Sequence, residues 1–317
     1  MTPKPSACLE IADALLEAAT GEAGSTTAAR VDAHVSRCAP CRDEFVRYRA
    51  IDRAAARLRE VVPPPGVAAE ARRHLLERLA DVRSRLVAYG VFASPLGPIL
   101  IARSEQGIAL IEYVRGASAR PRLENCEAVE APTEVEPFHR ELLEYLQGRR
   151  TSLAWPLDFR GVRSRFHGAV LRTTAALPYG TVTSYTRIAR LLGSPRATRA
   201  VAQALRRNPL PIVVPCHRVI GASGALTGYA GRRVELKGRL LEVEGVSLAK
   251  ARRGPRVERA AMYARHREDT EYCLPTCGSL AGTSLADLTL FASRQCAEGC
   301  GLAPCSTCRP DLHPLPR

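Results

Sequence analysis

The sequence lacks acidic residues over a long central stretch. Between Gly161 and Val234 it contains 12 arginines and no aspartate or glutamate. A basic face that is merely solvated usually carries acids among its bases, so this absence favours a polyanionic partner, either nucleic acid or an anionic membrane. The chain as a whole, 317 residues, has a formal charge of +14.

Long apolar runs are also missing. No segment approaches the length of a membrane span, and residues 1–7 show no basic-then-apolar signal pattern. We therefore expect a cytoplasmic protein without membrane association. Aromatic residues make up only 5%, but hydrophobic residues reach 46%, so the chain can form a core and is long enough for two or three domains. In a reducing compartment, its 11 cysteines indicate metal ligands or reactive thiols rather than disulfides.

Residues 1–60 are predicted to be a helical module with a metal site. The spacing H-x3-C-x2-C places His34 and Cys38 on one helix face, followed by Cys41, with Cys8 upstream. Four such ligands can close a tetrahedral zinc site. The pattern resembles the small zinc-binding anti-sigma family, and the resemblance implies a protein partner or redox sensing. The alternative is that Cys8 is a core residue and the other three bind nothing.

The next two segments read as a connection and a scaffold. Residues 61–86 are predicted to be a proline-rich linker followed by an amphipathic helix. Residues 87–160 are predicted to be a small α+β domain with three strands and one helix, and nothing in it looks catalytic. We expect the strands at 87–92, 99–102 and 108–114, and the helix at 137–148.

Residues 161–247 read as mostly helical. One helix is predicted at 166–177, and Thr183 or Ser184 can cap a second. A turn at 193–195 separates it from a third, basic helix, which is the layout of a helix-turn-helix. The polar residues expected to face DNA there are Arg196, Arg199, Gln203 and Arg206. An ordinary helical hairpin is the alternative.

A candidate nucleophile follows the apolar run 212–214. Cys216 is followed by His217 and Arg218, and positive neighbours lower the pKa of a thiol and favour the thiolate. Taken alone, a buried structural cysteine explains Cys216 equally well.

Several motifs resemble the DNA O6-alkylguanine alkyltransferase family. They are L-P-Y-G-T-V-T-S-Y from Leu177, N-P-L-P-I-V-V-P-C-H-R-V-I from Asn208, G-A-L-T-G-Y to Tyr229 and L-L-E-V-E-G to Gly245. S-P-L-G-P and W-P-L-D-F-R-G match the family's N-terminal half. The resemblance covers about residues 87–247. It implies a ribonuclease H-like half, then a winged-helix-like catalytic half that binds double-stranded DNA as a monomer without an organic cofactor.

The resemblance also implies residue roles. Cys216 would attack the alkyl carbon of O6-alkylguanine or O4-alkylthymine, His217 would take its proton through a water, and Glu244 would orient the imidazole. Asn208 would tie the backbone of the motif together. The residues implied to handle the extruded base are Tyr185, Tyr229 and backbone groups of Val219 and Ala230, with Arg199 filling the vacated place in the stack. Transfer would consume the protein, because a thioether is not readily reversed.

The C-terminal part is predicted to be a basic linker, 248–267, and a metal module, 268–312. Four cysteines spaced C-x3-C and C-x2-C form the predicted zinc site: Cys273, Cys277, Cys305 and Cys308. The pattern resembles the zinc domain of Ada-type methylation regulators, which implies methyl acceptance from phosphotriesters at Cys273. A purely structural zinc knuckle is the alternative.

The fold class predicted is therefore α+β and multidomain, with zinc modules at both ends. Two functions remain open at this point: repair by transfer to Cys216, and a regulatory sensor in which the zinc modules bind DNA or a transcription partner.

Overall fold

The computed structural model describes residues 8, 10–60, 64–114, 119–121, 123, 126–162, 164–229, 233–252 and 254–315. The chain forms two compact units, residues 1–78 and 79–317. In the described part, no helix is both long and apolar enough to cross a membrane.

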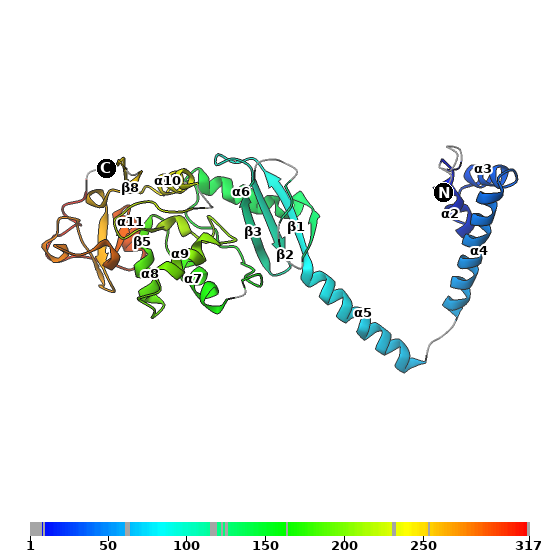
Figure 1. Ribbon diagram of the computed structural model, residues 1–317, viewed down its shortest axis with the longest axis horizontal. Helices are drawn as coiled ribbons and strands as arrows, with labels where there is room; N and C mark the ends of the chain where they lie inside the picture. The colour runs from blue at the N-terminus through cyan, green and yellow to red at the C-terminus, as the bar shows by residue number, and fades with distance from the viewer. Residues whose placement is uncertain are drawn as a thin grey trace. The chain divides into compact units, whose positions relative to one another are not determined.

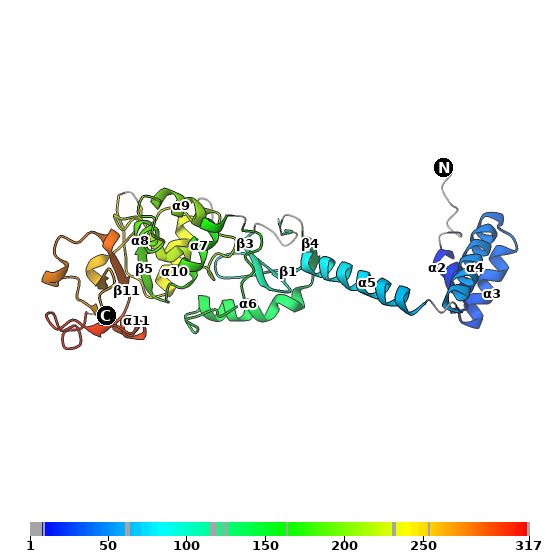
Figure 2. The same ribbon diagram turned by 90° about the horizontal axis from the view of Figure 1, so that it is seen from below.

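The first unit is a small helical cluster, drawn in blue in Figures 1 and 2. Its helices are α2 (Ala12–Thr20), α3 (Ser25–Val35) and α4 (Ala39–Glu60). Leu15 and Val31 form the centre of its core, together with Cys8, Ile11 and Cys41. Cys8 and Cys41, two of the predicted metal ligands, are thus also part of the hydrophobic core of this unit.

Helix α5 (Pro65–Arg85) follows, where the sequence predicts an amphipathic helix. Its apolar stripe is not buried: Leu75, Leu76, Leu79 and Val82 are between 42% and 58% exposed.

The second unit begins with an antiparallel meander covered by a helix. Strands β1 (Leu86–Phe92), β2 (Ile99–Ser104) and β3 (Gly107–Tyr113) agree with the three predicted strands, and β4 (Glu127–Glu130) pairs parallel with β1. The strand order is β3-β2-β1-β4. Helix α6 (Pro132–Leu146) lies along one face of this sheet (Figure 1).

Helix α6 begins five residues before the predicted helix at 137–148. The reason is Pro132, whose fixed φ suits the first position of a helix and whose missing N–H is not needed there. Pro137 consequently lies inside the helix.

The segment that follows, residues 164–246, is built from short helices around two small strands. Its elements are α7 (Arg165–Ala175), β5 (Thr181–Ser184), α8 (Tyr185–Leu191), α9 (Thr198–Arg206), η1 (Cys216–Arg218), β6 (Val219–Ile220) and α10 (Val234–Val243). The Ser184 hydroxyl accepts a hydrogen bond from the Arg187 amide at 3.1 Å and caps α8, as one of the two predicted caps. Gly193 adopts φ 66° in the turn between α8 and α9.

The prediction of a linker at 248–267 is wrong. That segment forms β7 (Leu248–Ala249), β8 (Arg256–Val257), η2 (Arg259–Ala261) and β9 (Tyr263–His266). The basic composition of the segment suggested exposure, but Met262 and Ala264 between the charged residues are completely buried. Side chains of arginine can reach solvent while the backbone between them pairs in a sheet.

The C-terminal region consequently shares a sheet with the segment 164–246. The order of that sheet is β6-β5-β11-β9, where β11 is Leu288–Phe291. Figure 2 shows β11 beside β5. The remaining C-terminal elements are β10 (Glu271–Tyr272), η3 (Gly278–Leu280), η4 (Leu285–Asp287), α11 (Arg294–Gly299) and β12 (Ala303–Pro304).

Candidate active site

Cys216 lies at the start of η1, at the end of a tightly held loop. Its side chain is buried, with 6% exposed. Ile212, four residues earlier, has φ 77°, a conformation that costs a β-branched residue about 1–3 kcal/mol and persists only where its surroundings hold it.

Asn208 provides that hold. Its Nδ2 donates to the Val214 carbonyl at 2.9 Å and contacts Cys216 Sγ at 3.3 Å, and its Oδ1 accepts from the Leu210 amide at 3.0 Å. One side chain therefore bonds both ends of the loop and the sulfur itself.

Behind the sulfur lies a buried polar cluster. Nε2 of His217 is 2.5 Å from Oε1 of Glu244. Arg218 donates to both oxygens of Glu244, from Nε at 2.8 Å and from its terminal nitrogen at 3.1 Å. The Tyr145 hydroxyl donates to Glu244 and accepts from Arg218 at 3.0 Å. The Gly180 amide donates to Oε2 of Glu244 at 3.1 Å.

This cluster keeps Glu244 ionised. Burial raises the pKa of its carboxyl. Together, His217 and Arg218 lower this pKa by more than burial raises it, and the result is a pKa of about 2. Burial lowers the pKa of His217, although Glu244 acts in the opposite direction. With Nε2–H donated to Glu244, the other ring nitrogen, Nδ1, is unprotonated. Nδ1 is buried and has no hydrogen-bond partner among the described residues, so it is available to accept a proton.

The expected effect of positive neighbours on Cys216 is corrected by the structure. Burial raises the pKa of the Cys216 thiol, and the hydrogen bond from Asn208 and the positive charge of Lys237 offset this only in part. Arg218 does not help, because its charge is paired with Glu244. The thiol must therefore be deprotonated by a base during the reaction, rather than resting as a thiolate.

The wall in front of the sulfur consists of tyrosines and a lysine. The hydroxyls of Tyr113 and Tyr229 are 2.9 Å apart. Tyr185 donates to the Thr227 carbonyl at 3.1 Å. Lys237 is completely buried, and its Nζ donates to the carbonyls of Val219 at 2.6 Å and Thr227 at 3.1 Å. Burial lowers the pKa of Lys237 to about 8.

Three of these residues were not predicted from the sequence as members of the site: Tyr113, Tyr145 and Lys237. Tyr145 is 99 positions from Glu244 and Tyr113 is 116 positions from Tyr229, and no local pattern marks such contacts. No local pattern marks Lys237 either, because its helix α10 carries other charged residues such as Glu235 and Arg239. Ala230, a predicted site residue, lies outside the described residues.

The residues predicted to face DNA are all exposed to solvent. Val201, Ala204 and Leu205 of α9 are buried, whereas the polar residues of α9 and the preceding turn are exposed: Arg196, Arg199, Gln203 and Arg206. A helix that is anchored on one side and presents arginines on the other fits a polyanion.

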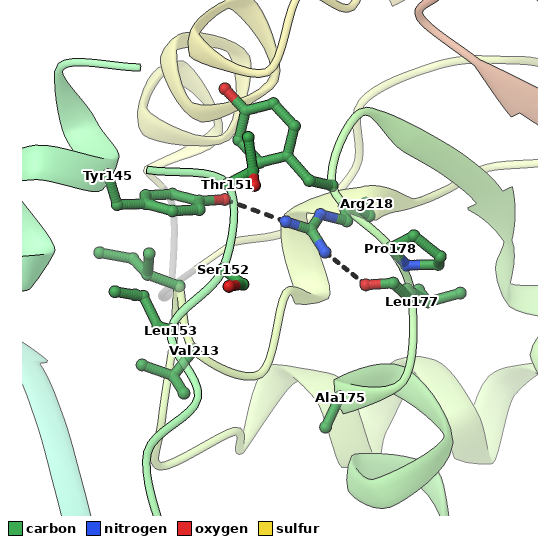
Figure 3. Close-up of a pocket in the computed structure, with 11 residues that line it drawn as sticks. Tyr145, Thr151, Ser152, Leu153, Ala175, Leu177, Pro178, Val213 and Arg218 are labelled. Carbon is green, nitrogen blue, oxygen red and sulfur yellow. Dashed lines mark hydrogen bonds between the residues drawn. The ribbon is translucent and has the colours of Figure 1, made fainter. Parts of the chain in front are cut away.

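A cavity of about 150 Å³ lies on the far side of the Glu244 cluster. Figure 3 shows Tyr145 and Arg218 among the residues that line it, with Arg218 bonded to the Tyr145 hydroxyl and the Leu177 carbonyl. Because Tyr145 and Arg218 both bond Glu244, we regard this cavity as part of the support of Glu244.

Both predicted metal clusters are brought together. Cys8, His34, Cys38 and Cys41 form one, and Cys273, Cys277, Cys305 and Cys308 the other; in each, the ligand atoms lie within 4.8 Å of one another. Nε2 of His34 is buried without a hydrogen-bond partner among the described residues, as expected of a ligand atom. Sets of four sulfur or nitrogen donors at this spacing could hold a metal ion.

A protein with such a centre can use its own thiol as a nucleophile beside a helix suited to a polyanion. Two family models match the chain: 6-O-methylguanine DNA methyltransferase, ribonuclease-like domain, over residues 87–159, and the DNA binding domain of the same family over residues 165–246.

Relatives agree with these models. The constitutive methylated-DNA–protein-cysteine methyltransferase of Bacillus subtilis is 40% identical over 161 residues, 50% of this chain and 96% of that protein. The methylated-DNA–protein-cysteine methyltransferase of Methanosarcina acetivorans is 39% identical, over 50% of this chain and 97% of that protein. The crystal structure of Mycobacterium tuberculosis O6-methylguanine methyltransferase is 35% identical with a TM-score of 0.43, covering 50% of this chain and 92% of that one. The chain belongs to the 6-O-methylguanine DNA methyltransferase family, as the sequence motifs indicated.

Proposed function

We propose that this protein repairs DNA by moving a methyl or larger alkyl group to Cys216, from O6 of guanine or from O4 of thymine. The observation that carries the proposal is the buried sulfur held by Asn208 beside the His217–Glu244 pair. Relatives that share 96% and 97% of their length with this chain are named as methylated-DNA–protein-cysteine methyltransferases. Those names favour transfer over the alternative of a sensor that does not repair.

The reaction is a displacement at the alkyl carbon. Nδ1 of His217 takes the Cys216 proton through a water, and Glu244 stabilises the imidazolium that forms. The sulfur's electron pair forms the S–C bond, and the C–O6 bond breaks with its electrons moving to the guanine. The guanine regains neutrality by taking up a proton.

The base must leave the duplex to reach Cys216, because the alkyl carbon is inaccessible inside the stack. Arg199, exposed near the start of α9, would fill the vacated position. Tyr185 and Tyr229 would line the pocket, and backbone groups of Val219 and Ala230 would read the base edges. Arg196, Gln203 and Arg206 would contact the DNA backbone.

The product is a thioether at Cys216, so each molecule acts once. Incubation with a duplex whose O6-methylguanine carries a labelled methyl group tests this: the label bound should approach one per chain and then stop. Cys216→Ser should bind the duplex and take up no label. Continued turnover, or full labelling of the serine variant, would refute the assignment.

We further propose zinc as the metal of both clusters, with no organic cofactor. A zinc ion would supply a tetrahedral centre that holds four thiolate or imidazole ligands together. The N-terminal cluster, within the predicted module 1–60, would present a surface to a protein partner. Metal analysis of Cys8→Ser and Cys305→Ser tests both sites: each variant should lose one zinc equivalent, and unchanged zinc content in either would defeat that site.

The presence of free cysteines is compatible with a cytoplasmic location, which we also propose. No disulfide occurs among the 11 cysteines, all of which lie in the described part of the chain.

A further inference from the structure

The C-terminal four-cysteine cluster (Cys273, Cys277, Cys305 and Cys308) is connected to the active site by a series of paired backbone segments. Cys273 and Ala264 of β9 exchange two of them, at 3.0 and 2.8 Å. Ala264 is paired with Leu290 of β11, and Leu290 is paired with Val182 of β5. The sheet thus runs directly from a metal ligand to the strand that precedes Tyr185.

The last step of the series reaches Glu244. The amide of Ala292, just after β11, donates to the Gly180 carbonyl at 2.8 Å. The amide of Gly180 in turn donates to Oε2 of Glu244 at 3.1 Å. One peptide unit on each side of Gly180 therefore joins the C-terminal region to the carboxylate that supports His217.

Gly180 cannot be replaced by a larger residue without strain. It adopts φ 67°, a region that favours glycine. A Cβ at this position would lie 2.8 Å from Cys296 Sγ and 3.2 Å from the Glu244 carbonyl. The close approach of α11 on one side and Glu244 on the other explains why glycine is required here.

Packing and charge reinforce the connection. Cys273, Cys277 and Cys305 belong to the same buried cluster as Val182 and Leu290. Glu268 pairs with the buried Arg187, and Asp287 pairs with Arg190, so two acids of the C-terminal region hold helix α8, which begins at Tyr185.

We propose that the C-terminal cluster is a positioning element of the active site: the bound metal fixes the β9–β11–β5 sheet, and this sheet fixes Gly180 against Glu244. Without the metal, nothing would hold the four cysteines together in the buried core to which three of them belong. In small metal modules, the free energy of ion binding is a large part of the free energy of folding. Glu244 would then lose a hydrogen-bond donor, and the reactivity of Cys216 would fall. The effect on repair rests on the proposed function; the effect on Gly180 does not.

The N-terminal cluster offers an internal comparison, because it belongs to the other compact unit. Cys305→Ser removes a ligand of the C-terminal cluster, and Cys41→Ser removes a ligand of the N-terminal one, both from buried positions. Only Cys305→Ser should affect the active site.

The test uses the full-length protein loaded with zinc, treated with a chelator, and reloaded. Hydrogen exchange followed by mass spectrometry reports on the peptide containing residues 177–184, and methyl uptake from an O6-methylguanine duplex reports on Cys216. After chelation, and in Cys305→Ser, we expect exchange of the Gly180 segment to rise at least about tenfold and the uptake rate to fall at least about tenfold. Zinc should restore both in the wild type, which separates positioning from failure to fold; Cys41→Ser should keep wild-type values.

Unchanged exchange at 177–184 after verified loss of metal would overturn the proposal, and so would purified protein without metal at these cysteines. A slower uptake with unchanged exchange would also overturn it, because the metal would then act elsewhere. If the wild type takes up no methyl at all, the proposed function fails, while the exchange experiment still decides whether the cluster controls Gly180.

Discussion

Nε2 of His217 lies 2.5 Å from Oε1 of Glu244, and neither side chain is exposed to solvent. A buried carboxylate in this position fixes the tautomer of the imidazole and leaves Nδ1 free for the proton of Cys216. The pair is buried away from bulk solvent, so the pKa values of both groups are set mainly by their protein neighbours.

Replacement of Glu244 by glutamine tests the role of the charge. Glu244→Gln keeps a side chain of similar shape but cannot stabilise an imidazolium, so we expect the single-turnover transfer rate to fall about 100-fold or more. It also leaves the buried Arg218 without an ionic partner, which should destabilise the protein by about 3–5 kcal/mol. Rates measured well below the melting temperature separate the two effects. A rate within threefold of wild type would exclude Glu244 from the mechanism.

Acid should affect both stability and rate, in a direction fixed by the shifted pKa values. The pKa of His217 is lowered by burial from 6.5, so the folded state resists protonation, and the stability present above pH 6.5 falls as the pH drops below it. The pKa of Glu244 is about 2 rather than 4.5, so its contribution is present above pH 4.5 and is lost as the pH falls towards 2. Melting temperature and transfer rate measured from pH 8 to pH 4 should both decline on the acid side. A melting temperature independent of pH down to 4 would contradict this account.

Asn208 should matter for the position of the sulfur. Asn208→Ala leaves the Leu210 amide and the Val214 carbonyl without their partner, and we expect a loss of about 1–3 kcal/mol in the free energy of unfolding. Asn208→Asp can still accept from Leu210 but cannot donate to Val214 or Cys216. Chemical denaturation and transfer kinetics of both variants distinguish the loop from the sulfur contact: if the aspartate variant transfers at the wild-type rate, the donor contacts are unimportant.

Arg199 should be needed for duplex substrates and not for the thiol itself. Arg199→Ala should lower methyl uptake from an O6-methylguanine duplex about tenfold or more, while the rate at which iodoacetamide alkylates Cys216 stays the same. Arg172→Ala, an exposed arginine of α7, is the matched control for loss of one positive charge. Equal effects of the two variants would reduce the role of Arg199 to general attraction of DNA.

Local patterns predicted much of this fold. Alternating apolar residues and turn motifs identified β1, β2 and β3, and the glycine-containing turn between two amphipathic segments identified α8 and α9. These features depend on neighbours in sequence, which a pattern can capture.

The support of the active site could not be found in this way. Tyr145 reaches Glu244 across 99 positions, and the partnership of Gly180 with Ala292 links two segments that a supposed linker separates. The family resemblance indicated Glu244 and Asn208 but not these contacts. Burial also reversed the expected effect on the pKa of Cys216. Arg218 is close to Cys216 in sequence, but its guanidinium bonds Glu244 rather than the sulfur.

The most direct test of the account is to locate the transferred group. The full-length protein is reacted with a duplex containing one O6-methylguanine and then digested with a protease. The masses of its peptides are measured by mass spectrometry. We predict a gain of one methyl group on the peptide carrying Cys216 in nearly every molecule, with restored guanine in the DNA. An unmodified Cys216, with the methyl on another cysteine or still on the DNA, would contradict the central claim.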